Sequence, residues 1–408
     1  MPWVTEHHPT TTELNACVQC GLCLPMCPTF RLTGRETASP RGRLHAMSAV
    51  SEGIIGVDES FAAILDFCLG CRACEPVCPG LVPYGRTLEG ARAEIDAQIP
   101  GRASRNRWTV GTALGSRPLM RLAGVGLSVA QSLGLTRLAP KKYRRVTGGL
   151  RPLRGRPSSS IGHVGGSGDS GTIGLLAGCI QDEWFRPVNQ VAITLLEQAG
   201  YTVAVPEGQT CCGALAGHDG KADAAKRYMS QNADAFGGFD YVVATAAGCS
   251  AHLADYTWMG HVPETLDVTV AVARAINDGL LPRVEADKGK IAIQDPCHLR
   301  HAQRVVDEPR AILEAAGYEV VEIDDVALCC GAAGLYTILQ PEASEQLGTQ
   351  KADQVRATGQ QKVASANPGC EMQLRSHLES EFTIKHPIEW YLESLADQER
   401  TGAKWSSR

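Results

Sequence analysis

The stretch Cys17-Val-Gln-Cys-Gly-Leu-Cys-Leu-Pro-Met-Cys-Pro28 places four cysteines at steps of three, three and four and closes with a proline. The same arrangement returns as Cys68-Leu-Gly-Cys-Arg-Ala-Cys-Glu-Pro-Val-Cys-Pro79. Three thiolates at steps of three can wrap one short loop around a compact metal centre. The fourth thiolate then lies beyond a turn that the proline fixes. The repetition predicts two metal centres near the start of the chain.

Runs of this spacing hold [4Fe–4S] clusters in bacterial ferredoxins, where the fourth cysteine of each run ligates the other cluster. We therefore expect two crossed ligand sets, one of Cys17, Cys20, Cys23 and Cys78 and the other of Cys68, Cys71, Cys74 and Cys27. The alternative is zinc, which favours two separated Cys-x2-Cys pairs and fits an intact run of four poorly. Apolar residues at helical spacing between the runs indicate an α-helical domain: Leu44, Met47, Val50, Ile54, Phe61, Ile64 and Leu65.

The other eight cysteines belong to an internal repeat. Cys179 and Cys211 are separated by 32 positions, as are Cys297 and Cys329, and the two pairs are displaced by 118 residues. Each copy continues with a Cys-Cys-Gly turn and ends with Gly-Cys. We therefore expect two equivalent four-thiolate sites: Cys179, Cys211, Cys212 and Cys249 in the first repeat, and Cys297, Cys329, Cys330 and Cys370 in the second.

Apolar runs and helical periodicity alternate through both copies. Strands are predicted over 172–177, 201–205 and 241–245 and again over 290–294, 318–323 and 362–365, with helices over 188–200 and 310–317. Alternation of this kind predicts parallel sheets whose carboxyl edges gather the residues that follow the strands. Adjacent cysteines can face one centre only from a tight turn, and Gly213 and Gly331 permit one.

Composition excludes several classes of protein. The 408 residues are 44% hydrophobic and 20% charged with a net charge of −5, which fits a multidomain globular protein without a nucleic-acid partner. Residues 1–12 have no apolar signal core, and no run is long enough to span a bilayer. We expect a reducing, cytoplasmic compartment in which the 16 cysteines are free to bind metal.

A basic segment separates the two cysteine-rich regions. Residues 101–170 contain thirteen Lys or Arg and one acid, Asp169, and 151–171 reads as a loose linker. The mixed apolar and basic stretch 119–138 predicts an interfacial helix on the anionic inner face of the cytoplasmic membrane, near quinone. The alternative is a solvated connector that packs on the protein or on a partner subunit.

These motifs together resemble a known family. The matching stretches include the two cysteine runs, Pro40-Arg-Gly-Arg43, Cys211-Cys-Gly-Ala214, Ala247-Gly-Cys249, Cys297-His-Leu-Arg-His-Ala-Gln303, Leu328-Cys-Cys-Gly331 and Asn367-Pro-Gly-Cys370. The repeat resembles the cysteine-rich domain of the heterodisulfide reductase B subunit, and the whole chain resembles the iron–sulfur subunit of bacterial glycolate oxidase. The resemblance implies an α+β multidomain protein: an α-helical ferredoxin domain with two [4Fe–4S] clusters (10–102), a basic connector (103–170) and duplicated α/β CCG domains with parallel sheets (171–288 and 289–396).

The resemblance also implies a function. A separate FAD-binding flavoprotein subunit would oxidise glycolate to glyoxylate, and this chain would pass electrons to membrane quinone or another acceptor. The Gly-x-Gly-x-x-Gly spacing occurs only at 166–171, at the end of the linker and ahead of a predicted strand rather than between a strand and a helix, so no flavin and no catalytic residue are expected on this chain. Beyond the two ferredoxin clusters, the repeats have room for one or two more. Because related subunits belong to D-lactate and glycerol-3-phosphate dehydrogenases, D-lactate and glycerol-3-phosphate remain alternative substrates of the complex. A regulatory zinc protein remains an alternative class of protein.

The chain departs from the resemblance at one position in each repeat. The heterodisulfide reductase form ends each domain with Cys-x2-Cys, whereas this chain has His252 and Gln373 at the last position. This puts a five-thiolate cluster and thiol-disulfide reductase activity in doubt. His252 can be a nitrogen ligand to iron, or simply a histidine on the helix after the strand. His298 and His301 can hydrogen-bond a cluster or lie in an interface.

Overall fold

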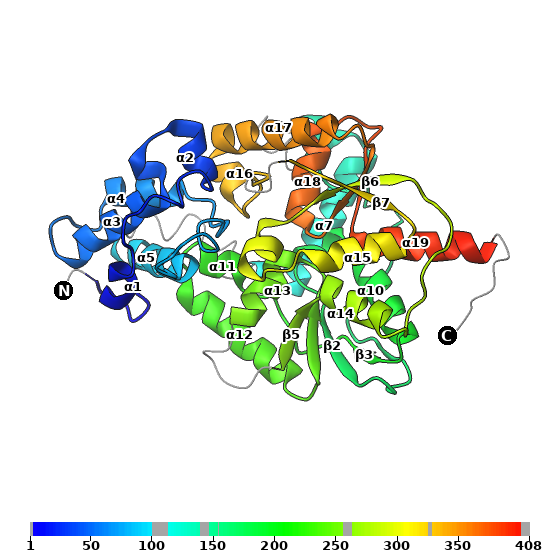
Figure 1. Cartoon of the computed structure of the whole chain (residues 1–408). Coiled ribbons are helices and arrows are strands. Elements are labelled where there is room, and N and C mark those ends of the chain that lie inside the picture. Colours follow the sequence, from blue (N-terminus) through cyan, green and yellow to red (C-terminus); the bar gives the residue numbers. More distant parts are fainter. Residues whose placement is uncertain are drawn as a thin grey trace.

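The computed structural model describes residues 3–99, 113–138, 147–153, 155–255, 263–324 and 329–400. In this part of the chain a helical N-terminal domain packs against two α/β domains (Figure 1). Residues 103–112 and 139–146 of the basic connector and Leu328 lie outside the described residues.

The N-terminal domain is helical, as predicted. Its helices are α1 (Thr11–Asn15), α2 (Pro28–Thr33), η1 (Glu36–Ala38), α3 (Pro40–Ser51), α4 (Glu59–Asp66) and α5 (Tyr84–Gln98). Ser39 caps α3 by accepting a hydrogen bond from the Gly42 amide, and Asp58 caps α4 by accepting one from the Phe61 amide. The apolar residues at helical spacing form the core of the domain, in which Met47, Val50 and Leu65 are fully buried. The loops that carry the cysteines lie at the periphery of this core.

The first α/β domain contains a five-stranded sheet in the order β1-β3-β2-β4-β5. Its elements are β1 (Val164–Gly165), β2 (Thr172–Leu176), α9 (Ile180–Trp184), α10 (Arg186–Gln198), β3 (Thr202–Ala204), α11 (Ala214–His218), α12 (Ala222–Phe236), β4 (Tyr241–Ala244), α13 (Ala247–Ala254), β5 (Glu264–Asp267) and α14 (Val268–Asn277). The pairs β2–β3, β2–β4 and β4–β5 are parallel, and only the edge strand β1 is antiparallel.

The second α/β domain repeats this plan with a fully parallel sheet in the order β7-β6-β8-β9. Its elements are β6 (Lys290–Gln294), the π-helix η5 (His298–Ala302), α15 (Asp307–Ala315), β7 (Glu319–Glu322), α16 (Tyr336–Leu339), α17 (Pro341–Ala357), β8 (Lys362–Ser365), α18 (Pro368–His377), β9 (Thr383–Lys385) and α19 (Pro387–Arg400). The strands predicted in each copy are therefore present, shorter by a residue or two where they differ.

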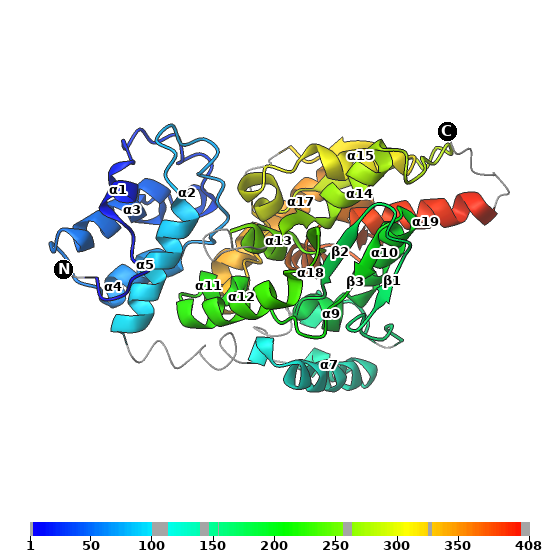
Figure 2. The same cartoon turned by 90° about the horizontal axis from the view of Figure 1, so that it is seen from below.

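The two sheets share one helical layer. Helices α10, α14, α15 and α19 lie between them in Figures 1 and 2 and join a single core with residues of both sheets. Successive residues of β4 point to opposite faces of the first sheet. Val243 belongs to the core shared with the second sheet, whereas Val242 and Ala244 pack against α11 and α12 on the other face. Because both faces of each sheet are covered, the strand sequences are continuous runs of apolar residues rather than alternations of apolar and polar residues.

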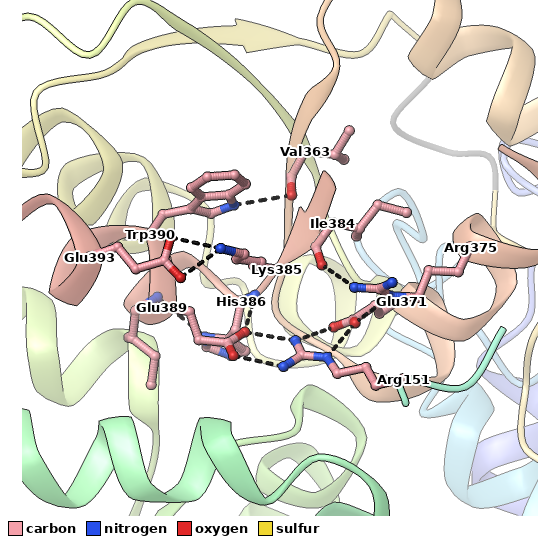
Figure 3. Close-up of polar contacts among 11 residues, drawn as sticks. Arg151, Val363, Glu371, Arg375, Ile384, Lys385, His386, Glu389, Trp390 and Glu393 are labelled. Atoms are coloured by element: carbon pink, nitrogen blue, oxygen red, sulfur yellow. Dashed lines mark hydrogen bonds and ion pairs between the residues drawn. The ribbon is translucent and has the colours of Figure 1, made fainter. Parts of the chain in front are cut away.

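The connector differs from the expected loose linker at two points. Val164 and Gly165 form the edge strand β1 on the first sheet. Arg151 is partly buried and makes paired hydrogen bonds with two carboxylates of the second α/β domain, Glu371 and Glu389 (Figure 3). Residues 151–171 have the composition of a linker, but their contacts connect the two α/β domains.

Helix α7 (Arg117–Ser132) lies along the outside of the first α/β domain, beside α9 (Figure 2). It follows η2 (Ala113–Gly115) and precedes η3 (Leu135–Leu138). Gly124 allows the close contact, since a Cβ there would lie 2.6 Å from Glu183 Oε2. Among the described residues, no helix combines the length and apolarity needed to cross a membrane.

Candidate iron–sulfur sites

The two cysteine runs fold into loops with the same backbone pattern. Gln19 and Gly21 have positive φ angles of 55° and 83°, and the equivalent Gly70 and Arg72 have 65° and 59°. Positive φ is costly for residues other than glycine, so its recurrence at matching positions shows that both loops adopt the same specific backbone conformation. This conformation wraps each loop around a separate candidate cluster site.

The first centre gathers cysteines from both runs. A cavity at the surface of the N-terminal domain is lined by Cys17, Cys20 and Cys23 of the first run together with Cys78, the last cysteine of the second. Cys74 also borders this cavity. The predicted crossed set is thus brought to one place, and Cys20, the exposed member, marks its solvent side.

The second centre is buried. Cys68, Cys71 and Cys74 are enclosed with Cys27, and burial together with the mutual proximity of these thiols raises the pKa of Cys71 and Cys74 well above its usual value. Burial also opposes ionisation of Cys68, but the charges of Arg43 and Arg92 outweigh it and lower the pKa of that thiol.

Arg43 connects the two runs at this buried centre. Its side chain is fully buried on α3, and its Nη1 lies 3.9 Å from Cys27 Sγ. The guanidinium also donates to the Ile64 carbonyl and the Thr29 hydroxyl, both at 3.0 Å. A fixed positive charge beside four thiolates stabilises their anionic state. The spacing argument missed this role, although Arg43 lies within a stretch that carries the family resemblance.

In the first repeat, all four predicted cysteines meet at the carboxyl edge of the sheet. Cys179 Sγ lies 3.4 Å from Cys211 Sγ, and Cys212 Sγ lies 3.1 Å from Cys249 Sγ. Gly213, at φ +88°, forms the turn that lets the adjacent pair face one centre and begins α11.

The second repeat reproduces the arrangement. Cys330 Sγ lies 3.3 Å from Cys370 Sγ, and Cys297 is hydrogen-bonded with Cys329. Gly331 has a φ of +85°, matching Gly213, but no helix begins at this turn. A helix therefore begins at the Cys-Cys-Gly turn of the first repeat only.

The donor sets fit iron–sulfur clusters. All 16 cysteines are free thiols, and in each repeat the packed sulfurs and burial hold thiol pKa values well above normal. A bound metal ion would lower these thiol pKa values, because a coordinating thiol is deprotonated. Among the described residues no group of side chains is spaced for a single metal ion, and iron bound between the touching sulfurs would spread them outward.

His252 and Gln373 each lie against the Cys-Cys-Gly turn of their repeat, since a Cβ at Gly213 would lie 3.4 Å from His252 Nε2 and one at Gly331 would lie 3.4 Å from Gln373 Nε2. His252 is buried on α13, where its ring lies edge-on to His218 with centroids 5.8 Å apart. Gln373 Nε2 donates to the Ser344 carbonyl at 3.1 Å. The interpretation of His252 as a histidine on the helix after the strand agrees with its position.

A buried polar cluster occupies the junction of the three domains. The ring of His298 lies 5.2 Å from that of His218 and its Nδ1 lies 3.6 Å from Cys297 Sγ, so it is both a neighbour of the sulfur and an interface residue. Burial lowers the pKa of His252 to about 4 and that of His298 to about 3, which keeps both imidazoles neutral. Burial would raise the pKa of Glu89, but its hydrogen bond with His218 dominates and the pKa falls to about 2.

The buried ferredoxin centre adjoins the second repeat. Leu69 and Cys71 pack in one cluster with Cys329, Cys330 and Cys370. The Tyr336 hydroxyl donates to the Phe67 carbonyl at 3.2 Å across this boundary. The centres therefore follow one another from the exposed first run, through the buried second run, to the second repeat. This order depends on tertiary packing, and the spacing of the cysteines does not contain it.

Comparison with known proteins agrees with this organisation. Residues 13–82 match the model of a 4Fe-4S dicluster domain, and residues 173–254 and 291–375 each match that of a cysteine-rich domain. The chain is 34% identical to the probable glycolate oxidase iron-sulfur subunit of Bacillus subtilis, with 90% of each chain covered. It is 27% identical to the glycolate oxidase iron-sulfur subunit of Escherichia coli, over 92% of this chain and 93% of the relative. It is also 26% identical to the B subunit of the fumarate reductase (CoM/CoB) of Methanothermobacter marburgensis, over 92% of this chain and 70% of that protein.

Proposed function

The chain belongs to the family of glycolate oxidase iron–sulfur subunits, and we propose that it carries electrons to a quinone in the membrane from a flavoprotein partner that oxidises glycolate. The observation that carries the proposal is the packing of the second cysteine run against the second repeat. Sites in contact allow electrons to move between them without a mobile carrier. When bound, the clusters supply one-electron redox chemistry.

The residues of this chain hold and tune the proposed centres. The crossed sets Cys17, Cys20, Cys23 and Cys78, and Cys68, Cys71, Cys74 and Cys27, are the ligands of two [4Fe–4S] clusters, and the four cysteines of each repeat hold a further one. Arg43 and Arg92 supply positive charge to the buried centre. Hydrogen bonds and charge near the sulfurs set reduction potentials, so these arginines favour electron arrival there.

The direct test of the proposed function is reduction of the chain by substrate. The complex is purified anaerobically with its flavoprotein subunit, its iron and labile sulfide are counted, and glycolate is added while the EPR spectrum is followed. Glycolate should reduce the clusters, and D-lactate or glycerol-3-phosphate should do so at least tenfold more slowly. Faster reduction by either rival substrate reassigns the complex to that substrate. Zinc without labile sulfide contradicts the iron–sulfur assignment.

Helix α7 supports contact with the membrane. Seven of the sixteen exposed large apolar side chains in the described residues lie between 119 and 138. On α7 the stripe formed by Leu122, Val125, Val129 and Leu133 faces outward, whereas Met120 and Gly124 face the protein. A helix normally buries its apolar face, so this stripe needs another occupant. The surrounding excess of basic residues selects an anionic lipid surface.

The double variant Leu122→Asp, Val129→Asp is expected to release the complex from membranes. Burial of each leucine or valine contributes about 1.5–3 kcal/mol, so binding should weaken at least tenfold. Flotation with liposomes that contain anionic lipid measures the bound fraction. The matched control is Ile54→Asp, Val164→Asp, which changes two apolar residues outside α7 that are at least as exposed as Leu122 and Val129. Equal flotation of both double variants would show that α7 does not anchor the complex.

A further inference from the structure

A cavity separates α7 from the cysteine site of the first repeat. It is lined by Cys179 and Cys211 on the inner side and by Met120 and Arg121 of α7 on the outer side. Its volume is about 430 Å³, within the range of roughly 300–1,000 Å³ typical of pockets for small organic ligands. A molecule in this cavity would touch two of the four cysteines of the site.

One carboxylate in the cavity wall is left without a hydrogen-bond partner on one oxygen. Asp182 is 6% exposed, and its Oδ2 accepts a hydrogen bond from the Ser159 hydroxyl at 2.7 Å. Its Oδ1 is buried and has no partner among the described residues. A buried carboxylate oxygen without a partner is costly, so a ligand that bonds to it would be stabilised.

Three other polar residues of the cavity wall are engaged with protein groups. Glu183 is ion-paired with Arg156 and Arg186. Arg117 donates to the Gln209 carbonyl at 2.7 Å, and Thr210 donates to the Gly115 carbonyl at 3.3 Å. Asp182 and the exposed Arg121 are thus the groups best placed to meet a ligand, beside an apolar wall that includes Met120 and Ile161.

The two repeats differ in what lies over their cysteines. In the second repeat the site is covered by Leu69, Cys71 and Phe67 of the N-terminal domain, which suits a relay between neighbouring centres. In the first repeat Cys179 and Cys211 border the cavity instead. The equivalent sites of a duplicated fold therefore have different surroundings, and the first has room for a small oxidant.

Resting on the proposed function, we propose that this cavity binds the head group of a quinone, between Met120 of α7 and the cysteines of the first repeat. A quinone ring has flat apolar faces that match the apolar wall, and on reduction its two carbonyl oxygens become hydroxyl groups, one of which can donate to the unpartnered Oδ1 of Asp182. The ring gains two electrons, delivered one at a time by this subunit from glycolate oxidation. Both ring oxygens take a proton from water at the mouth beside Arg121, giving the quinol, and the hydroxyl beside Asp182 donates a hydrogen bond to its Oδ1.

The position of α7 accounts for access to the cavity. Its inner face lines the cavity and its outer face carries the apolar stripe that we assign to the membrane. A helix with its side chains is about 10–12 Å across. The prenyl tail of a quinone can therefore remain in the bilayer while its head group lies behind α7.

Binding of ubiquinone-1 to the oxidised complex, measured by equilibrium dialysis, tests the cavity without turnover. Met120→Trp should fill the cavity and weaken binding at least tenfold, whereas Ala123→Trp, on an exposed face of the same helix, should bind as the wild type does. Asp182→Asn keeps the size of the side chain and the Ser159 contact but removes the negatively charged acceptor for the quinol hydroxyl. It should lower the ratio of ubiquinone-1 reduction to ferricyanide reduction at least tenfold, while Asp234→Asn, on α12, leaves that ratio unchanged.

The outcomes separate this inference from the proposed function. Wild-type complex that reduces ferricyanide with glycolate but binds no ubiquinone-1 overturns the quinone cavity and leaves the electron-transfer role standing. Equal binding by the wild type and the Met120→Trp variant does the same. Complex that binds ubiquinone-1 in the cavity but is not reduced by glycolate overturns the proposed function alone. Normal binding with an unchanged reduction ratio in the Asp182→Asn variant shows that Asp182 does not stabilise the quinol and contradicts the proposal as stated.

Discussion

Replacing Cys27 with alanine is expected to remove the cluster of the second run, although Cys27 belongs to the first run in sequence. The reason is spatial: Cys27 is enclosed with Cys71 and Cys74 and lies 3.9 Å from the Arg43 guanidinium, whose charge also acts on Cys68. Loss of this buried centre should lower the iron content by about four atoms, the iron of one [4Fe–4S] cluster. It should also abolish glycolate-dependent acceptor reduction, because this centre adjoins the second repeat.

Double variants decide which cysteines share a cluster. Under the crossed assignment, Cys27→Ala with Cys71→Ala loses no more iron than either single variant, since both changes destroy the same site. Cys27→Ala with Cys20→Ala should lose about twice as much, because two clusters are affected. An uncrossed arrangement gives the reverse pattern, so iron and sulfide analysis of the two double variants is sufficient.

The sequence alone can propose which cysteines share a site, because their spacing is local. A step of three residues constrains a loop directly, and the equal separation of Cys179–Cys211 and Cys297–Cys329 reports a duplicated fold whatever the intervening packing. The parallel sheets followed from apolar runs alternating with helical periodicity, and the strands over 290–294 and 362–365 have the predicted bounds.

What the sequence did not reveal depends on contacts between distant segments. Arg43 occupies an ordinary helical position, and only its burial beside Cys27 shows its role. Glu89 and His218, 129 positions apart, form a hydrogen bond because α5 packs on α11. The antiparallel edge strand at 164–165 is two residues long within a glycine-rich stretch, and so has no detectable periodicity. The contrast between the covered and the open repeat depends on the same long-range packing.

Arg151 is the clearest such case, and its replacement is expected to weaken the assembly of the α/β domains. Arg151 comes from the connector, yet its guanidinium donates to Glu371 and Glu389, at distances of 2.6–2.7 Å, from positions 220 and 238 residues away (Figure 3). The three side chains are 13%, 3% and 8% exposed. The guanidinium also lies 5.3 Å from the centroid of the Phe185 ring in the first repeat. It therefore connects both repeats, one of them at the residue following Cys370.

Arg151→Met should destabilise the protein by about 3–5 kcal/mol, because the buried Glu389 loses its counter-charge and the buried Glu371 is left with Arg375 alone. At about 2–4 °C per kcal/mol for a unit of 150–250 residues, the melting temperature should fall by roughly 10 °C. Arg151→Lys keeps the charge but loses the paired geometry, and should show an intermediate loss. A triple variant, Arg151→Met with Glu371→Gln and Glu389→Gln, removes the buried charges together and should recover most of the loss.

The pH dependence gives this prediction a second signature. Burial would raise the pKa of Glu389, but the hydrogen bond and charge of Arg151 lower it overall. A carboxylate with a lowered pKa in the folded state stabilises the protein above its unfolded pKa of about 4.3 and loses that contribution as the pH falls. Without Arg151, burial dominates and the pKa of Glu389 rises, so protonation relieves the variant. The gap in melting temperature between wild type and Arg151→Met should therefore narrow from pH 8 towards pH 5. A gap that stays constant over this range would mean that Arg151 acts by packing, through Phe185, rather than by charge.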